Sequence, residues 1–324
     1  MGRIIKTGDY TFAVASVRIK EISLLTDREI AQLISAQDGG SVKRLLESWG
    51  WSKGISGDDD LMLDMKLIKT WEFIEEIMPN INIMDSLIIG NDFHNLKASL
   101  RCFFCGEEPD ELFIEPAKYN PYEIYAAIKD KDFLLLPQIM QEPAELAYET
   151  YVKTQDSRYM DVYIDRATLA AILNISSESG KFFHSIAEIK CAGADIKIAL
   201  RSLLTHRDEE FMKTALCPCS SLDVKELRIS AKMGIKELEE YLKTTVYSDA
   251  AELLGNKSAL ERWFDNAALQ YVSEAKYIQE GPEPVAAYYM MSEAEIRNIR
   301  IILSGKRADI PESVLQKRMR RIYV

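Results

Sequence analysis

The 324-residue chain has little of what interrupts helices or cross-links a fold: 15 glycines, 10 prolines and 5 cysteines. Because glycine and proline break regular helices, their scarcity favours helices over sheets and turns. A small, odd number of cysteines argues against a framework of disulfide bonds. No segment shows a convincing alternation of apolar and polar residues. The sequence therefore predicts an all-α fold.

Long apolar runs are also missing. No segment approaches the roughly 18 apolar residues that a membrane-spanning helix needs. The first residues, M-G-R-I-I-K-T-G, lack the apolar core of a signal peptide and the Ser or Thr at position 6 that N-myristoylation requires. We therefore expect a cytosolic protein without direct membrane insertion, which meets a membrane only through a partner.

Basic residues are outnumbered, since 40 Lys and Arg stand against 51 Asp and Glu and give a formal net charge of −11. An acidic surface repels phosphate backbones, so we expect no nucleic-acid partner. The C-terminal segment with Lys317, Arg318, Arg320 and Arg321 is a local exception. We interpret it as a solvated helix end.

The motifs of catalysis and cofactor binding are missing as well. Neither Ser179-Gly-Lys nor Leu254-Gly-Asn-Lys-Ser has the first glycine of the phosphate loop G-x-x-x-x-G-K-[ST]. The chain also contains no H-E-x-x-H, G-x-S-x-G or G-x-G-x-x-G. Gly57-Asp-Asp-Asp60 lacks the ligand spacing of a calcium loop, and we interpret it as an exposed turn that caps the next helix. We expect no catalytic residues, no cofactor and no small-molecule substrate.

What the sequence does contain is a short segment that occurs three times. It reads N-L-K-A-S-L-R-C-F-F from Asn95, D-I-K-I-A-L-R-S-L-L from Asp195 and N-I-R-I-I-L-S-G-K-R from Asn298, at offsets of 100 (195 − 95) and 103 (298 − 195) residues. Steps of three and four between apolar residues place them on one helix face. The recurring positions, which we expect to be structural, are Asn95, Leu96, Lys97, Leu100, Asp195, Ile196, Lys197, Leu200, Asn298, Ile299, Arg300 and Leu303.

The repeat predicts three units of similar length. Asn298 lies 26 residues before the last residue (324 − 298), and the positions 26 residues after the other two copies fall in breaker-rich stretches. These stretches are P-A-K-Y-N-P-Y (116–122) and C-P-C-S-S-L (217–222). We therefore divide the chain into helical units at 1–118, 119–221 and 222–324, each a small bundle.

Several helices can be placed within these units. Thr26 and Glu29 form a T-x-x-E capping box, and Ser41 is expected to cap the next helix. A helix over 67–78 should end at Pro79. Further helices are expected over 166–175, 181–191, 224–242, 259–280 and 285–303.

Cys102 and Cys105 form a C-x-x-C pair close to His94 and could indicate a zinc or thiol-redox site. A tetrahedral zinc site usually takes two such pairs, and C-P-C at 217–219 has an unusual spacing for a second. A redox pair normally begins a helix, whereas this one ends a helix just before Gly106. None of the three histidines has a clear metal-ligand partner, so we favour no metal site.

The repeat supports this interpretation of the cysteines. Cys102 and Cys105 align with Ser202 and Thr205 in the second copy, so sulfur is not part of the recurring pattern. The intervening phenylalanines, at 103 and 104, align with leucines and extend the apolar face. We interpret the phenylalanines as core residues and the cysteines as incidental.

Two stretches resemble signatures of the C subunit of the archaeal and bacterial V/A-type rotary ATPases, whose eukaryotic counterpart is the d subunit. They are Asp92-Phe-His-Asn-Leu-Lys and Glu295-Ile-Arg-Asn-Ile-Arg-Ile-Ile-Leu-Ser-Gly-Lys, the latter followed by Ile310-Pro311. The resemblance extends over essentially the whole chain. Asp309, where glycine is expected before Ile-Pro, and C-F-F-C depart from the family pattern.

The resemblance implies an all-helical funnel of three similar domains around a pseudo-threefold axis. It further implies a non-catalytic rotor part on the cytoplasmic side of the membrane. Such a part receives the central shaft, made of the D and F subunits, and passes torque to the membrane rotor ring of proteolipid subunits. We expect acidic helix ends to face the shaft. The alternatives are a helical-repeat adaptor of another complex and a metal or thiol-redox protein that uses Cys102 and Cys105.

Overall fold

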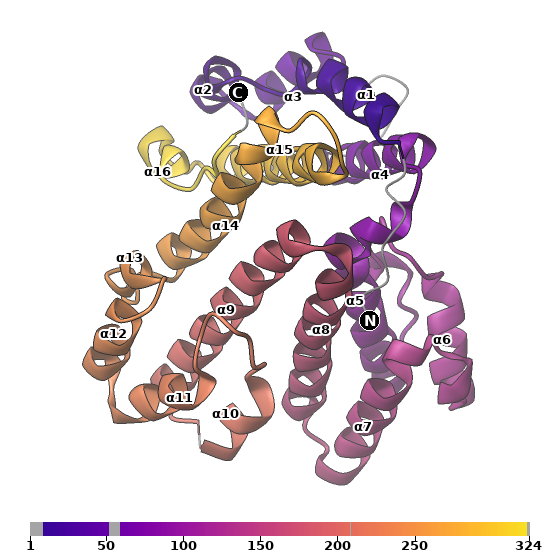
Figure 1. Cartoon of the computed structure of the whole chain (residues 1–324), viewed down its shortest axis with the longest axis vertical. Helices are drawn as coiled ribbons and strands as arrows, with labels where there is room; N and C mark the ends of the chain where they lie inside the picture. Colours follow the sequence, from indigo (N-terminus) through magenta and orange to yellow (C-terminus); the bar gives the residue numbers. More distant parts are fainter. Residues whose placement is uncertain (1–8, 52–58, 208, 323–324) are drawn as a thin grey trace. The chain divides into compact units, whose positions relative to one another are not determined.

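The computed structural model describes residues 9–51, 59–207 and 209–322 (Figure 1). Within these residues all regular elements are α-helices or short 3-10 helices, apart from one isolated bridge between Cys219 and Leu222. The all-α prediction is therefore confirmed. In the same ranges, no helix combines the length and the apolar character that crossing a membrane requires.

The chain folds into two compact units, unit 1 with residues 1–82 and 261–324, and unit 2 with residues 83–260. The first two copies of the repeated segment lie in unit 2 and the third lies in unit 1. The three units predicted from the sequence, divided after residues 118 and 221, describe repeats in the sequence. The two compact units are a different division, so the three-unit division stays a prediction.

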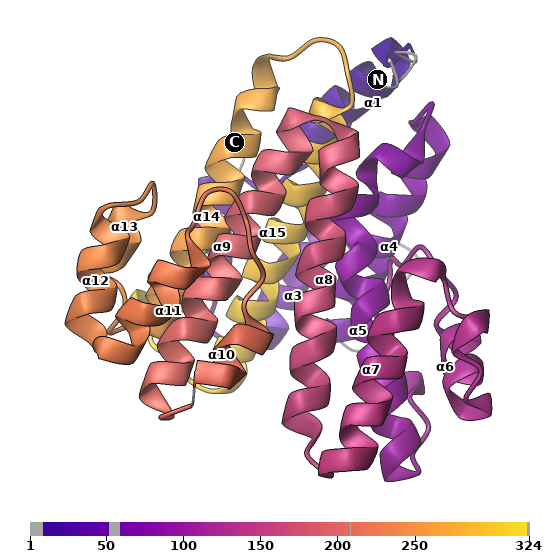
Figure 2. The same cartoon turned by 60° about the horizontal axis from the view of Figure 1, so that its bottom comes forward.

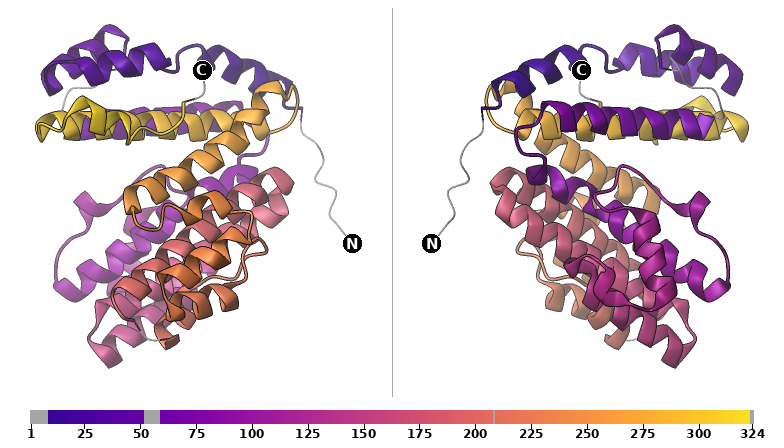
Figure 3. Two further views of the ribbon diagram at one scale, coloured as in Figure 1. Left: turned by 90° about the vertical axis from the view of Figure 1, so that its left-hand side faces the viewer. Right: turned by 90° about the vertical axis from the view of Figure 1, so that its right-hand side faces the viewer.

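Unit 1 is built around one long helix, α15 (Glu283–Arg307), in which 17 of 25 residues are buried. α15 packs beside α4 (Asp59–Ile77), and the N-terminal helices cover one side of this pair (Figure 3). Leucine and isoleucine side chains from α2, α3, α4 and α15 form the core, together with Leu315. The other elements are α1 (Thr11–Glu21), α2 (Asp27–Ser35), α3 (Gly39–Ser48), η4 (Glu274–Tyr277) and α16 (Glu312–Gln316). α14 (Lys257–Ser273) begins in the last residues of unit 2.

Unit 2 is a bundle in which α8 (Ser157–Ser179) contacts α5 (Asp85–Cys105), α7 (Gln138–Thr154) and α9 (Lys181–Leu204) (Figure 2). Its core takes Phe93, Leu96 and Leu100 from α5. The remaining helices are α6 (Pro121–Asp130), α10 (Glu209–Ala215), α11 (Val224–Met233), α12 (Ile235–Lys243) and α13 (Ser248–Ala251). Its 3-10 turns are η2 (Asp110–Leu112) and η3 (Phe133–Leu135), and η1 (Ile81–Met84) spans the boundary with unit 1.

Helix starts agree with the sequence in one case and differ in another. The capping box of Thr26 and Glu29 is present at the start of α2 and is confirmed. Ser41 was the wrong cap for α3, because the helix begins two residues earlier and Asp38 caps it by accepting the Ser41 N–H at 2.7 Å. A carboxylate at the N-cap also suits the positive end of the helix dipole.

Helix lengths were also predicted imperfectly. The helix expected over 224–242 is two helices, separated at Gly234, which has φ of 148°. L-residues rarely adopt this conformation, so glycine allows the chain to turn there. The helices expected over 166–175 and 181–191 are longer and become α8 and α9, which meet at Gly180. Of the acidic turn at 57–60, residues 57 and 58 lie outside the described ranges, and α4 begins at Asp59.

The basic C-terminal segment agrees only in part with the solvated helix end that the sequence predicts, since Lys317, Arg318 and Arg321 are exposed but Arg320 is not. α16 stops at Gln316, and the Arg320 side chain is only 10% exposed. Its Nε donates to Asp265 at 2.9 Å, and Glu261 lies 3.7 Å from its Nη2. Since the two carboxylates come from α14, Arg320 fastens the segment to unit 1, while the other basic side chains remain exposed.

Candidate functional site

The first residue of each repeated segment is completely buried inside a long helix: Asn95 in α5, Asp195 in α9 and Asn298 in α15. Asn298 donates from Nδ2 to the Arg320 carbonyl at 3.0 Å and accepts the Arg320 N–H at 2.7 Å. Asn95 makes the same pair of bonds with Ile114, at 3.0 and 2.9 Å. We call this arrangement a backbone clamp, because one side chain satisfies both polar groups of a residue far along the chain.

The clamp at Asp195 differs because a carboxylate has no N–H. Asp195 accepts the Cys217 N–H at 3.0 Å, 22 residues further on (217 − 195). The Cys217 carbonyl accepts instead from the thiol of Cys191, with Sγ and O 3.4 Å apart. Cys191 lies one helical turn before Asp195 in α9. In this copy, Asp195 and Cys191 therefore make the two hydrogen bonds that a single asparagine amide makes in the other copies.

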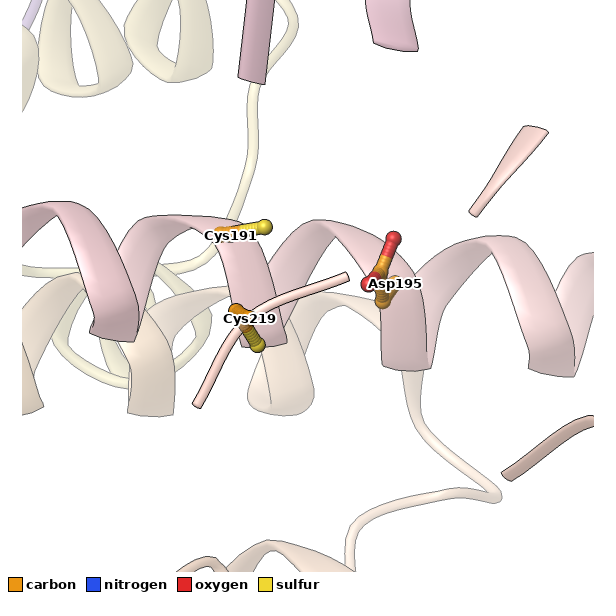
Figure 4. Close-up of side chains that lie close together, drawn as sticks. All are labelled: Cys191, Asp195 and Cys219. Atoms are coloured by element: carbon orange, nitrogen blue, oxygen red, sulfur yellow. The ribbon is translucent and has the colours of Figure 1, made fainter. Parts of the chain in front are cut away.

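Cys219 completes a group with these two residues (Figure 4). One ligand-type atom from each of Cys191, Asp195 and Cys219 lies within 4.8 Å of the other two. Cys191 and Asp195 are buried, and Cys219 is half-buried. The Asp195 Oδ2 atom has no hydrogen-bond partner. The described ranges hold no second such group of three or more metal-capable side chains.

The group has unusual proton affinities. Burial raises the pKa of Asp195 to about 8, although the Cys217 N–H opposes the shift. Hydrogen bonds to the Cys217 and Cys219 side chains, together with burial, raise the pKa of the Cys191 thiol. The bond from Cys191 lowers the pKa of Cys219. Cys219 is therefore the more readily ionised of these two thiols.

A cavity of about 460 Å³ lies beside the group, and Cys217 and Cys219 form part of its wall. Glu188, also on the wall, accepts the N–H groups of Ser220 at 3.0 Å and Ser221 at 2.8 Å. These bonds hold the loop that carries Cys219 against α9. Solvent in the cavity can therefore approach a fixed thiol.

The cysteines singled out in the sequence do not take part in this group. Cys102 is buried and Cys105 is exposed at the end of α5, which stops at Gly106 in the left-handed conformation. His94 contacts the Leu112 carbonyl at 3.0 Å. Phe103 and Phe104 pack against the unit 2 core, where Phe104 stacks on Tyr148 with centroids 5.1 Å apart.

The other recurring positions are mostly structural contacts. All six apolar ones are buried: Leu96, Leu100, Ile196, Leu200, Ile299 and Leu303. The basic position pairs with a carboxylate on a neighbouring helix in two copies. Lys97 pairs with Asp165, and Arg300 lies 2.5 Å from Asp64. Lys197 is half-buried.

Sequence reasoning missed the group at Cys191, Asp195 and Cys219. The sequence held a signal for two of the three residues, since residues at i and i+4 share a helix face and Cys191 precedes Asp195 by four. The contribution of Cys219 depends on the path of a loop, which the helix pattern does not specify. Of the two cysteines of C-P-C, Cys219 belongs to the group, together with Cys191 from α9.

Comparison with known proteins finds one protein family that matches nearly the full length of the chain. The family model described as "ATP synthase (C/AC39) subunit" matches residues 13–318. The chain is 23% identical over 319 residues to the C subunit of the V-type sodium ATPase of Enterococcus hirae, covering 95% of this chain and 97% of that protein. The matched range includes both partners of the clamps at Asn95 and Asp195, and Asn298 of the third clamp, whose partner Arg320 lies two residues beyond it. The chain belongs to the ATP synthase C/AC39 subunit family, which comprises the C and d subunits of V/A-type ATPases.

Proposed function

We propose that this chain is the central-stalk rotor subunit that links the D and F subunits of the shaft to the membrane rotor ring of a V/A-type ATPase or ATP synthase. The observation that carries the proposal is the family match over residues 13–318. The chain is not an enzyme by itself but a component of an ion-translocating complex. It would lie on the cytoplasmic side of the membrane, with its three sequence units forming the funnel that receives the shaft.

Transmission of torque needs stiff parts, and the packing within each unit supports that role. α15 is largely buried and contacts α1, α2, α3, α4 and α16. Closely packed interiors have low compressibility and transmit strain. The backbone clamps add to this stiffness, because each ties a non-helical segment to the middle of a long helix.

A rotor part also needs surfaces for its partners, and α1 offers a candidate. Phe12, Ile19 and Ile22 are 70%, 71% and 85% exposed. Steps of seven and three along the chain place Phe12 and Ile19 on one face of α1, and Ile22, the C-cap residue of the helix, continues that face. Single exposed apolar residues are ordinary, whereas several on one face support a contact with another protein. The acidic excess of the chain supports additional polar contacts that weaken as salt rises.

The test is capture of partners from membranes by the tagged chain at low ionic strength, followed by mass spectrometry. We expect the D and F subunits and the ring proteolipid to be recovered, and recovery to fall in high salt. A variant with Phe12→Ser, Ile19→Ser and Ile22→Ser should recover less. The matched control removes exposed apolar groups of unit 2, with Leu134→Ser and Leu135→Ser.

Circular dichroism checks that both variants keep their helices. Recovery of a different complex without any rotary ATPase subunit would contradict the proposal and favour the adaptor alternative. Equal recovery by the α1 variant and the unit 2 control would leave the family role intact but exclude α1 as the contact.

A further inference from the structure

We propose that Cys191, Asp195 and Cys219 form a binding site for a thiophilic divalent cation of the zinc type. The site lies inside unit 2 and does not depend on the proposed role in torque transmission. Two of its ligands come from successive turns of α9 and the third comes from the loop after residue 216 (Figure 4).

The spacing of the ligand atoms is close to what a tetrahedral ion requires. Zinc binds thiolate sulfur at about 2.3 Å and carboxylate oxygen at about 2.1 Å, which places the ligands about 3.6 to 3.8 Å from one another. The three atoms here all lie within 4.8 Å of one another. Movement of about 1 Å, within reach of small side-chain rotations, therefore closes the site.

The unpartnered oxygen of Asp195 is the second observation that points to a ligand. A buried polar atom without a partner is costly, and such atoms are rare in folded proteins. The Asp195 Oδ1 atom already accepts the Cys217 N–H, so Oδ2 remains available to a cation while that hydrogen bond is kept. Asp92 also has an unpartnered Oδ2, but it belongs to no group of metal-capable side chains in the described ranges.

The comparison with the other clamps strengthens this point. The amides of Asn95 and Asn298 use both their oxygen and their nitrogen on the clamped residue. Of the three clamps, the one with a carboxylate leaves an atom free, and the same clamp places two thiols beside it. Aspartate therefore replaces asparagine in the same clamp that has two thiols next to it.

The donor set selects the kind of ion. Two thiolates with one carboxylate suit zinc, whereas magnesium and calcium prefer oxygen ligands alone. The cavity has Cys219 in its wall and so provides an entry path to that thiol, and a water molecule would take the fourth position. Binding requires two thiolates and a carboxylate, so the protons held by these groups leave to solvent as the ion enters.

The test uses the full-length chain, reduced and freed of metal, titrated with Co²⁺ as a spectroscopic substitute for zinc and then with Zn²⁺ in competition. We expect one Co²⁺ per chain, with the visible bands of a tetrahedral ion and a thiolate charge-transfer band. Cys219→Ser and Asp195→Asn should each weaken binding by more than about 100-fold, since both remove a direct ligand. Cys105→Ser, which changes an exposed cysteine outside the site, should bind like the unchanged chain.

Asp195→Asn separates metal binding from folding. It installs the amide that already works in the other two clamps, so we expect the variant to keep its helices and to unfold at a temperature no lower than that of the unchanged chain while it loses Co²⁺. The proposal is overturned if the unchanged chain gives no tetrahedral Co²⁺ spectrum. It is equally overturned if Asp195→Asn and Cys219→Ser bind Co²⁺ as tightly as Cys105→Ser.

Discussion

The clamps at Asn298 in unit 1 and at Asp195 in unit 2 hold the same kind of target with different chemistry. Each fastens the backbone 22 residues further along the chain (320 − 298 and 217 − 195). Asn298 does so with a neutral amide that both donates and accepts. Asp195 only accepts, and Cys191 supplies the missing donor. The same structural task can therefore be met by a neutral group or by an ionisable one.

The difference has consequences for stability and for chemistry. A neutral amide fixes the clamp of unit 1 over the whole ordinary range of pH. The clamp of unit 2 contains a carboxyl group whose burial raises its pKa to about 8, so its charge changes near neutral pH. The most direct test of this difference is to place an aspartate at position 298 and an asparagine at position 195.

The largest effect is expected for Asn298→Asp in unit 1. The substitution removes the donor to the Arg320 carbonyl and buries a carboxyl group beside it. We expect a loss of about 3 kcal/mol in the free energy of unfolding at pH 8, measured by urea denaturation. The loss should be smaller at pH 5, because a protonated carboxyl can donate. Asn82→Asp, at an exposed position, is the control, and an equally large loss there would contradict the explanation.

The reciprocal change, Asp195→Asn in unit 2, should stabilise the metal-free chain. The folded state raises the pKa of Asp195 from 3.8 to about 8, so it holds a proton that the unfolded chain has already released. Stability from this group therefore falls as pH rises from about 4 to about 8. The variant lacks this fall and should gain about 2 kcal/mol relative to the unchanged chain at pH 8.

The measurement is urea denaturation at several pH values with a chelator present. The gain should shrink towards pH 4, where Asp195 is protonated in the folded state and partly protonated in the unfolded chain. Asp249→Asn, at an exposed position, serves as the control. A gain that does not vary with pH would show that ionisation of Asp195 is not its cause.

The smallest effect concerns the side chain of the clamped residue itself. Arg320 bonds to Asp265 and is mostly buried, so Arg320→Ala leaves Asp265 with one partner fewer. We expect a loss of about 1.5 kcal/mol in the free energy of unfolding. Arg318→Ala, two residues earlier and exposed, should change it by less than about 0.5 kcal/mol. Equal losses in the two variants would show that the side chain of Arg320 does not reinforce the clamp.

The sequence predicted the helices better than their ends. The apolar spacing at Leu96 and Leu100 identified buried positions, because helix periodicity is a local property. The break at Gly234 and the cap at Asp38 were missed, because several residues nearby could have ended or begun a helix. For the candidate site, the sequence indicated Asp195 as a recurring position but gave no reason to connect it with Cys219.

The sequence by itself determined an all-helical chain, its buried helix faces and three recurring Asn or Asp positions, since these depend on spacings within a single helix. The tertiary structure decided what those polar residues do. Each meets a segment 19 or 22 residues away (114 − 95, 217 − 195, 320 − 298), after the chain has left the helix and returned. That return path depends on the packing of the whole unit. It brings Cys219 to Cys191 and Asp195 and places Arg320 beside Asp265.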